Sequence, residues 1–488
     1  MRRLRRAALL SLALLTVFTL AAGIAVARML PPRLALWRLP TVASSGLAQA
    51  EPVLSPLPDA APGTTPHSGV SGGQLATAAG LTAALGHLLS SATLGSHVGA
   101  LVENLSTGQV LLSRQAQAGF APASTAKLAV AVAALHVLGP SARFTTKVVA
   151  GPTASSLVLV GGGDPTLAAG SFPAADYPQP ATLAALAAAT ARSLKARGVR
   201  SVRLSYDTSL FSGPGMAPGW TNGYVTTGNV TPIESLEVDQ GRLTPAGAPE
   251  DSDDPGNFRP RTFTPAAQAA QSFSSLLAAQ GIVVRGPLAQ AAARRGSATV
   301  ASVASPPLAE IVQQMLTESN NVIAENLARQ VAVATGRPAS FSGAAAAETA
   351  VLRQLGIRGT VRLVDGSGLS PQDRVAPDVL VQLIRLAAQT GQPGLRPVLT
   401  GLPVAGFTGT LAPGGSVFPD VGQAGLGLVR AKTGNLETVV SLAGLAQDRD
   451  GELFAFAFMA DQLPKTGLDT GAGDLTRLAT SLAACGCR

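Results

Sequence analysis

The stretch STAKLAVAVAALHVL, residues 124–138, joins a hydroxyl, an amine and an almost unbroken apolar run. Pro122, which a first helical turn tolerates, marks where a helix is expected to begin. Because the run from Leu128 to Leu138 is apolar all round, this helix must be buried on most sides. Ser124 and Lys127 are three positions apart, so they fall on one helix face. The stretch therefore predicts a buried helix whose first turn brings an amine to a hydroxyl.

The segments around this helix predict an α+β fold. Two strands joined by a turn precede it, and three strands with a closing helix end the chain. The predicted strands are VGALVEN (98–104), QVLLSRQ (109–115), GLVRAKTG (427–434), TVVSLAGLA (438–446) and LFAFAFMA (453–460), and the predicted helices are 75–89, 307–334, 341–355, 377–388 and 474–484. These segments are consistent with one mixed sheet flanked by helices.

Residues 146–300 differ in texture from the segments on either side. Short β-like runs such as SLVLVGG and SVRLSYD alternate with glycine- and proline-containing turns and an acidic loop at 250–254. The change predicts an inserted β-rich domain or domains. The domain that contains Ser124 is then expected in two parts, 76–145 and 301–488.

The N-terminus predicts export. Four arginines among the first six residues precede an uncharged, mostly apolar run from Ala7 to Ala27, long enough to cross a bilayer. Residues 1–30 are interpreted as a cleaved signal peptide or an uncleaved membrane anchor, and both alternatives stay open. Residues 31–75, rich in Pro, Ser, Gly and Ala, are expected to form a linker. A G-x-S-x-G match at 69–73 falls inside this linker and lacks the strand and helix that a nucleophile elbow requires.

Composition excludes several classes of function. The net charge of +8 is spread along the chain and no nucleic-acid motif accompanies it, so no nucleic-acid partner is expected. The only cysteines, Cys485 and Cys487, are interpreted as two tail thiols or a local bridge rather than a metal site. All four histidines lie at or before His136, which disfavours a histidine-based triad. Neither a metal nor an organic cofactor is expected.

Two further motifs follow Ser124-x-x-Lys127 along the chain. Ser319 and Asn321 lie in TESNNVIAENLA, where helix capping by Ser or Asn is the alternative interpretation. Lys432-Thr433-Gly434 lies at the end of a predicted strand, where Gly434 would let a substrate backbone approach closely. Each motif alone is weak. The order S-x-x-K, S-x-N, K-T-G, each in a fitting helix or strand context, is the three-part signature of the penicillin-recognising serine enzymes.

With its long gap between Ser124 and Ser319, the sequence resembles the D-Ala-D-Ala carboxypeptidase/endopeptidase family, the class C low-molecular-mass penicillin-binding proteins. Further segments resemble this family over roughly residues 76–488: GGGDPTL (161–167), SNNVIAENLA (319–328), DGSGLS (365–370), LPVAGFTGTL (402–411) and AKTGNLETVVSLAG (431–444). The resemblance implies a β-lactamase/transpeptidase-like catalytic domain interrupted by one or two inserted domains. Two positions depart from the family pattern. Asn320 stands where Asp is common, and Asn435 stands where Thr or Ser is usual.

The resemblance implies a serine peptidase that attacks D-Ala-D-Ala peptides of peptidoglycan, by carboxypeptidase or endopeptidase action, and that β-lactams acylate. In this hypothesis Ser124 is the nucleophile, and Lys127 accepts its proton. Ser319, linked to Lys127 and Lys432, protonates the leaving amine. Asn321 holds the substrate backbone. The substrate-binding residues are Thr433, Gly434 and Asn435. Of these, Thr433 and Asn435 face the substrate carboxylate together with Lys432.

Three alternatives stay open. A serine β-lactamase uses the same motifs but with a shorter first gap, and a catalytically silent wall-binding protein would share the fold. A second K-T-G at Lys465-Thr466-Gly467 lies inside LPKTG, which spells a wall-sorting pentapeptide. The following residues 468–488 contain charges at a spacing suited to an amphipathic helix, which disfavours wall sorting. The oligomeric state is left open.

Overall fold

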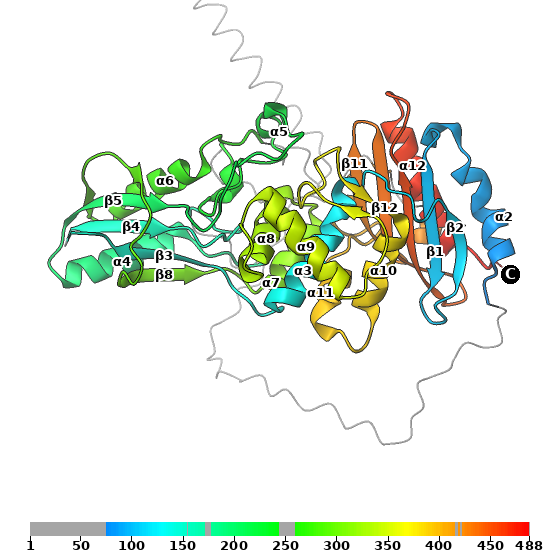
Figure 1. Ribbon diagram of the computed structural model, residues 1–488, viewed down its shortest axis with the longest axis horizontal. Coiled ribbons are helices and arrows are strands. Elements are labelled where there is room, and N and C mark those ends of the chain that lie inside the picture. Colours follow the sequence, from blue (N-terminus) through cyan, green and yellow to red (C-terminus); the bar gives the residue numbers. More distant parts are fainter. Residues whose placement is uncertain are drawn as a thin grey trace, which may run out of the picture. The chain divides into compact units, whose positions relative to one another are not determined.

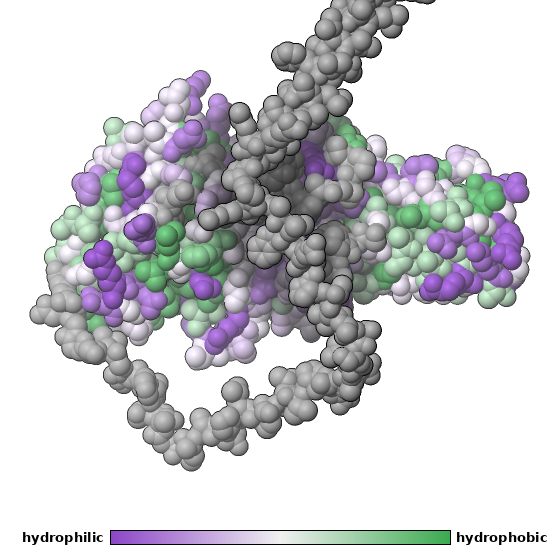
Figure 2. Space-filling view, turned by 180° about the vertical axis from the view of Figure 1, so that it is seen from behind, coloured by the Kyte–Doolittle hydropathy of each residue, from purple (hydrophilic) through white to green (hydrophobic). Residues whose placement is uncertain are grey.

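The computed structural model describes residues 75–153, 155–170, 177–243, 259–414, 418–419 and 422–487. The predicted signal or anchor segment, and the linker up to residue 74, lie outside these ranges. Within them no helix combines the length and apolarity that a membrane span requires. On the face seen in Figure 2, hydrophilic and hydrophobic residues are interspersed.

The central element is a five-stranded sheet in which every neighbouring pair is antiparallel. Its strands lie in the order β11 (Val429–Leu436), β12 (Val439–Gln447), β13 (Leu453–Ala460), β1 (Val98–Asn104) and β2 (Val110–Arg114). The first two strands of the described residues therefore extend a sheet whose other three strands lie near the C-terminal end of the sequence. All five strands were predicted from the sequence within about two residues of their bounds.

Strand β13 shows how the sheet separates two cores. Its side chains alternate between the two faces, as the pleat requires. Phe454, Phe456 and Phe458 pack on one side with α2 (Ala78–Leu89) and α12 (Leu468–Ala483). Ala455, Ala457 and Met459 pack on the other side. Helices that lie between β2 and β11 in the sequence cover this side (Figure 1). The two alanines on this second face leave room for α10 (Pro377–Ala388), which packs on β13, β1 and β12.

The helices of the second face surround α3 (Lys127–Leu138), which is buried along nearly its whole length. They are α7 (Leu308–Thr317), α8 (Asn321–Ala334), α9 (Phe341–Gln354), α10 (Pro377–Ala388) and the short α11 (Arg396–Thr400). The sequence predicted one helix over 307–334, and this was wrong. The chain breaks between α7 and α8 because Ser319 adopts a positive φ of 58° and Asn320 caps the new helix.

A second sheet lies between α3 and α7 in the sequence. Its strands are β6 (Val283–Val284), β5 (Ser201–Asp207), β4 (Ser156–Val160), β3 (Thr145–Ala150) and β8 (Thr299–Ala304), with β7 (Ala289–Gln290) also paired to β5. This sheet mixes parallel and antiparallel pairs. Helices α4 (Leu183–Ala196) and α6 (Pro265–Ala279) complete its core. The fold class expected from the sequence, an α+β catalytic fold with an additional β-rich part, is confirmed, and the domain boundaries stay a prediction.

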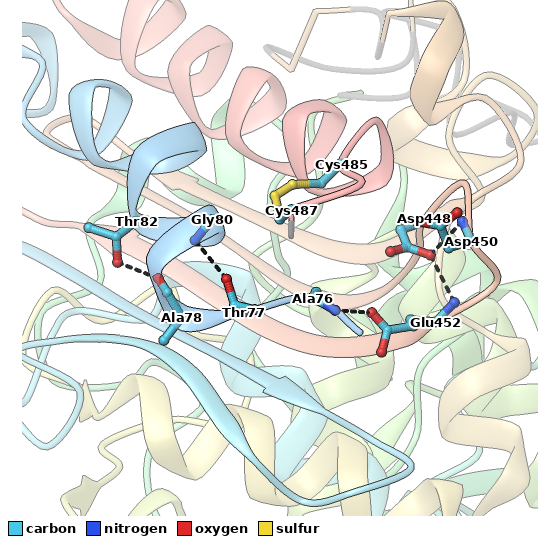
Figure 3. Close-up of a disulfide and its surroundings, with 10 residues drawn as sticks. All are labelled: Ala76, Thr77, Ala78, Gly80, Thr82, Asp448, Asp450, Glu452, Cys485 and Cys487. Atoms are coloured by element: carbon cyan, nitrogen blue, oxygen red, sulfur yellow. Dashed lines mark hydrogen bonds between the residues drawn. A yellow bond between two sulfur atoms is a disulfide. The ribbon is translucent and has the colours of Figure 1, made fainter. Parts of the chain in front are cut away.

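The last residues pack against the first described helix (Figure 3). Cys485 and Cys487 form a disulfide, one of the two alternatives that the sequence left open. The backbone oxygen of Cys487 accepts a hydrogen bond of 2.7 Å from the N–H of Thr77. Glu452 accepts the N–H of Ala76 at 2.8 Å. Both ends of the described chain are thereby fixed to the same face of the five-stranded sheet.

Candidate active site

Ser124 lies in a short 3₁₀ helix, η3 (Ala123–Ala126), that leads directly into α3. The residue before it, Ala123, has a φ of 46°, a conformation that costs free energy for any residue with a Cβ. Several contacts compensate this cost. The oxygen of Pro122 accepts hydrogen bonds from Ser441 Oγ at 2.6 Å and from Thr125 Oγ1 at 2.7 Å. The turn therefore presents Ser124 in one fixed conformation.

Lys127 points back at Ser124 from the first turn of α3. Its Nζ donates to Ser124 Oγ at 2.7 Å, to Asn321 Oδ1 at 2.7 Å and to the backbone oxygen of Ser367 at 2.8 Å. The amine is fully buried, and this burial lowers the pKa of Lys127 to about 7, although the negative charges of Asp365 and Glu325 oppose the shift. A large fraction of this lysine is thus uncharged at neutral pH and able to accept a proton.

The loop 365–370 supplies the third oxygen around Lys127. Two carboxylates fold this loop. Asp365 accepts the N–H groups of Gly368 and Ser370 at 2.7 and 2.6 Å. Glu325 Oε1 accepts the N–H of Ser367 at 2.7 Å. Glu325 is fully buried, and desolvation raises its pKa to about 7.

Sequence reasoning did not assign a role to Glu325 or Ser367. A signal for Glu325 was present, because it lies four residues after Asn321 and therefore on the same face of α8. Ser367 contributes a backbone carbonyl, and carbonyl groups leave no mark in a sequence.

Ser319 lies in the break between α7 and α8, opposite Lys432. Its Oγ accepts a hydrogen bond of 2.8 Å from Lys432 Nζ, which also donates to the oxygen of Thr433 at 2.8 Å. The sequence hypothesis linked Ser319 to both lysines. Within the described residues Ser319 forms a hydrogen bond with Lys432 and none with Lys127, whose amine bonds Asn321 instead.

Asn320 and Asn321 have different tasks. Asn320 Oδ1 accepts the N–H of Ile323 and so caps α8, as the alternative interpretation of this motif foresaw. Asn321 accepts from Lys127 and donates through Nδ2 to the oxygen of Asn229 at 2.9 Å. Its amide is thus engaged on both sides.

Strand β11 brings the third motif against the nucleophile turn. Gly434 is needed here, since a Cβ at this position would lie 2.3 Å from Ser441 Oγ and 2.9 Å from Ser124 N. The sequence had assigned this glycine to close approach by a substrate backbone. What approaches it in the structure is the Ser124 turn itself, so a glycine at 434 is what lets β11 and the 3₁₀ helix meet.

Along β11 the side chains change from buried at Lys432 to exposed at Asn435. Lys432 is fully buried, and desolvation, followed by the nearby charge of Lys127, lowers its pKa well below the ordinary value. Thr433 is nearly buried and shares a hydrogen bond of 2.6 Å with Thr410 Oγ1. Asn435 is exposed. The eight residues predicted from the sequence therefore lie together, in one site that opens at Asn435.

The described residues contain no group of three or more His, Cys, Asp or Glu that could hold a metal ion. The groups around Ser124 are two amines, hydroxyls, an amide and backbone N–H groups. Such a set suits nucleophilic acyl transfer, in which a hydroxyl is activated by a neutral amine.

A sequence profile of the D-Ala-D-Ala carboxypeptidase 3 (S13) family matches residues 81–259 and 246–480. The chain belongs to this family.

Two mycobacterial relatives match this S13-family chain over most of its length. The carboxypeptidase DacB of Mycolicibacterium smegmatis is 36% identical over 469 residues, which cover 96% of this chain and 97% of the relative. A carboxypeptidase of Mycobacterium tuberculosis is 39% identical over 418 residues, which cover 84% of this chain and 85% of the relative.

Among solved structures, the S13-family chain is similar to penicillin-binding protein 4 from Haemophilus influenzae. The TM-score is 0.66 at 24% identity, and the match covers 84% of this chain and 98% of the other. This likeness concerns the fold, and it agrees with the five-stranded sheet, its helices and the additional sheet described above.

Proposed function

We propose that this protein is a serine-type D-Ala-D-Ala carboxypeptidase that acts on peptidoglycan stem peptides through an acyl-enzyme at Ser124. The observation that carries the proposal is the 2.7 Å contact between Ser124 Oγ and the buried amine of Lys127. A serine hydroxyl becomes a good nucleophile only when a neighbour removes its proton. Membership in a carboxypeptidase family and the mycobacterial carboxypeptidase relatives support the substrate class.

Acylation begins when Ser124 Oγ attacks the carbonyl carbon between the last two D-residues. Lys127 Nζ takes the hydroxyl proton, for which its lowered pKa suits it. The backbone N–H groups of Ser124 and Asn435 stabilise the oxyanion that forms. Their adjacency is supported by the 2.9 Å between Ser124 N and the Cβ position of Gly434, which precedes Asn435.

The leaving amine takes a proton from Ser319. Because Ser319 Oγ accepts from Lys432 Nζ, its own O–H is left to donate toward the amine, and Lys432 resupplies it. Water then attacks the acyl carbonyl. Its proton passes through Ser319 to Lys432, and Lys127 returns its proton to Ser124 Oγ as that oxygen leaves, so both amines regain their starting states. Thr433 and Asn435 lie on the same strand as Lys432, where they face the terminal carboxylate of the peptide. That carboxylate favours the charged form of Lys432 and opposes the effect of its burial.

The test uses a fluorescent penicillin, because a β-lactam acylates the same serine that a D-Ala-D-Ala peptide acylates. The unaltered protein should become labelled and release D-Ala from a pentapeptide. Ser124→Ala should abolish both reactions. Ser275→Ala, on an exposed position of α6, is the matched control and should retain both. Failure of the unaltered protein to be labelled would support the alternative of a catalytically silent wall-binding protein.

The lifetime of the labelled form separates the peptidase from a serine β-lactamase. A peptidase holds the penicilloyl group for long times, whereas a β-lactamase turns penicillin over rapidly. Mass spectrometry of the protein after removal of excess penicillin therefore distinguishes the two. We expect a persistent adduct on the peptide that contains Ser124.

The same acyl transfer cleaves a peptide cross-link if the leaving amine belongs to a second stem peptide. The protein therefore acts as a carboxypeptidase, an endopeptidase or both. Incubating the purified protein with a pentapeptide and with a cross-linked dimer, and comparing the products, measures the balance.

This substrate lies outside the cytoplasmic membrane, so the protein is exported. The arginines before the apolar run 7–27 support this placement. Residues 1–30 then serve either as a cleaved signal or as an anchor. N-terminal sequencing of the mature protein from the membrane and soluble fractions decides between them.

A further inference from the structure

A histidine and an aspartate lie directly behind the nucleophile turn, outside the groups that contact either lysine. His97 precedes β1 and Asp461 follows β13, so they stand where Val98 and Ala460 pair. His97 Nδ1 and Asp461 Oδ1 are 2.5 Å apart. The side chain of Asp461 is 7% exposed and that of His97 is 26% exposed. This pair therefore lies at the end of the sheet and reaches the surface mainly through the histidine.

Both members of the pair contact the chain just ahead of Ser124. Asp461 Oδ2 accepts the N–H of Ala121 at 2.9 Å. The ring of His97 stacks on Phe120, with centroids 4.0 Å apart and an interplanar angle of 17°. One carboxylate thus joins the histidine to the backbone of Ala121, and the histidine contacts the preceding residue as well.

The segment needs such restraint because Ala123 is held at a positive φ. A strained backbone conformation persists only when its surroundings determine it several times over. The backbone groups of Phe120 pair with Val375, and the oxygen of Pro122 accepts from Ser441. Ala121 lies between these two anchors and is nearly buried. Among the described residues, Asp461 is the acceptor of its N–H.

We propose that His97 and Asp461 are positioning residues that fix Ser124 Oγ relative to Lys127. This inference rests on the proposed function. Asp461 fixes Ala121, and His97 fixes the rotamer of Asp461 while it packs on Phe120. Neither residue touches the reacting atoms. Displacing a nucleophile by a fraction of an ångström lowers the rate of attack far more than it changes substrate affinity.

The experiment measures the acylation rate constant per active site with a fluorescent penicillin, together with the labelled fraction at completion and the thermal midpoint. Asp461→Ala removes both contacts and should lower the rate constant at least tenfold. Asp461→Asn keeps an oxygen for Ala121 and an N–H for His97, so it should stay within about threefold of the unaltered protein. His97→Phe keeps the stacking on Phe120 and should lie between these two.

His136→Phe is the matched control, because His136 is exposed at the end of α3. It should leave the rate constant unchanged. For D-Ala release, Asp461→Ala should lower kcat while KM stays within about threefold.

A purely structural role would lower the thermal midpoint and the labelled fraction while the remaining sites acylate at the normal rate. That result for Asp461→Ala would overturn the inference, and so would an Asp461→Asn variant as slow as Asp461→Ala. If the unaltered protein is not labelled at all, the proposed function itself fails, which is a different outcome from normal labelling of every variant.

Discussion

At the scale of single residues, the site depends on an amine kept away from water. Burial lowers the pKa of Lys127 to about 7, so the amine is charged below that pH and largely neutral above it. Only the neutral form accepts the proton of Ser124. We therefore expect the acylation rate constant to rise about tenfold or more from pH 5.5 to pH 8, with a midpoint near 7. A penicillin-labelling profile that stays flat across this range would exclude Lys127 as the base.

Gly434 makes a second prediction at this scale. A methyl group there would meet Ser441 Oγ at 2.3 Å and the backbone of the nucleophile turn at 2.9 Å. Gly434→Ala should therefore push β11 away from Ser124 and slow acylation by about 100-fold. Gly86→Ala is the control, since a Cβ at Gly86 has nothing within 4 Å. In helix α2 this control should raise stability by about 0.5–1 kcal/mol in urea unfolding and leave acylation unchanged.

The sequence predicted which side chains lie together better than it predicted their hydrogen-bond partners. Spacing within one helix was enough to place Ser124 beside Lys127, because residues three apart share a face. The partners of Lys127 across the site were not predictable, since one is the backbone oxygen of Ser367 and another is an amide expected to bind substrate. Which oxygens an amine selects depends on tertiary packing.

At the scale of elements, the break between α7 and α8 creates the position of Ser319. The apolar spacing continues through the break, so periodicity alone indicated one helix. Asn320 begins α8 by accepting the N–H of Ile323 at 3.1 Å. The backbone turn at Ser319 then places its hydroxyl toward Lys432 rather than along a helix face.

Asn320→Ala should lower the free energy of unfolding by about 1 kcal/mol, because it removes the helix cap. Asn320→Asp keeps the capping oxygen and loses the donations from Nδ2 to Gln240 Oε1 and Glu318 Oε2. It should therefore retain most of the stability and the normal labelling by penicillin. Equilibrium urea unfolding measures the difference. Equal losses for the two variants would argue against the capping role.

At the scale of the whole molecule, a buried acid joins the additional β-rich part to α8. Glu237 Oε1 accepts from Asn326 Nδ2 at 2.5 Å, and burial raises the pKa of Glu237 to about 8. The pKa of Glu237 is higher in the folded protein than in the unfolded chain. The protonated carboxyl therefore contributes its full stabilisation below about pH 4.5, and this stabilisation is lost as the pH rises through 8. This group should therefore cost on the order of 3 kcal/mol of stability between pH 5 and pH 9.

Glu237→Gln mimics the protonated form and should remove most of this loss. Thermal unfolding at pH 6 and pH 9 compares the two proteins, with Glu437→Gln as an exposed control. A loss of stability at high pH that persists in Glu237→Gln would assign the effect to other groups.

The layout of the sheet was predictable only in part. The hairpin 98–115 and the run of three strands at the end of the chain carry clear local patterns. Their union through β1 and β13 joins segments far apart in the sequence. The order of the segments was consistent with one sheet, but it could not tell which strands pair. The contacts between α8 and residues 161–240, such as Gln330 Nε2 with the oxygen of Gly162, have no periodic signal at all.

The pairing of β1 with β13 has a consequence for synthesis. Ser124 emerges from the ribosome early, but β12, β13 and Asp461, which hold its turn, emerge almost last. Until then the early hairpin has no sheet to join, while the second sheet already has all of its strands. Penicillin should therefore not acylate Ser124 in a nascent or half-translocated chain. Acylation should begin only after the final strands have crossed the membrane and joined the sheet.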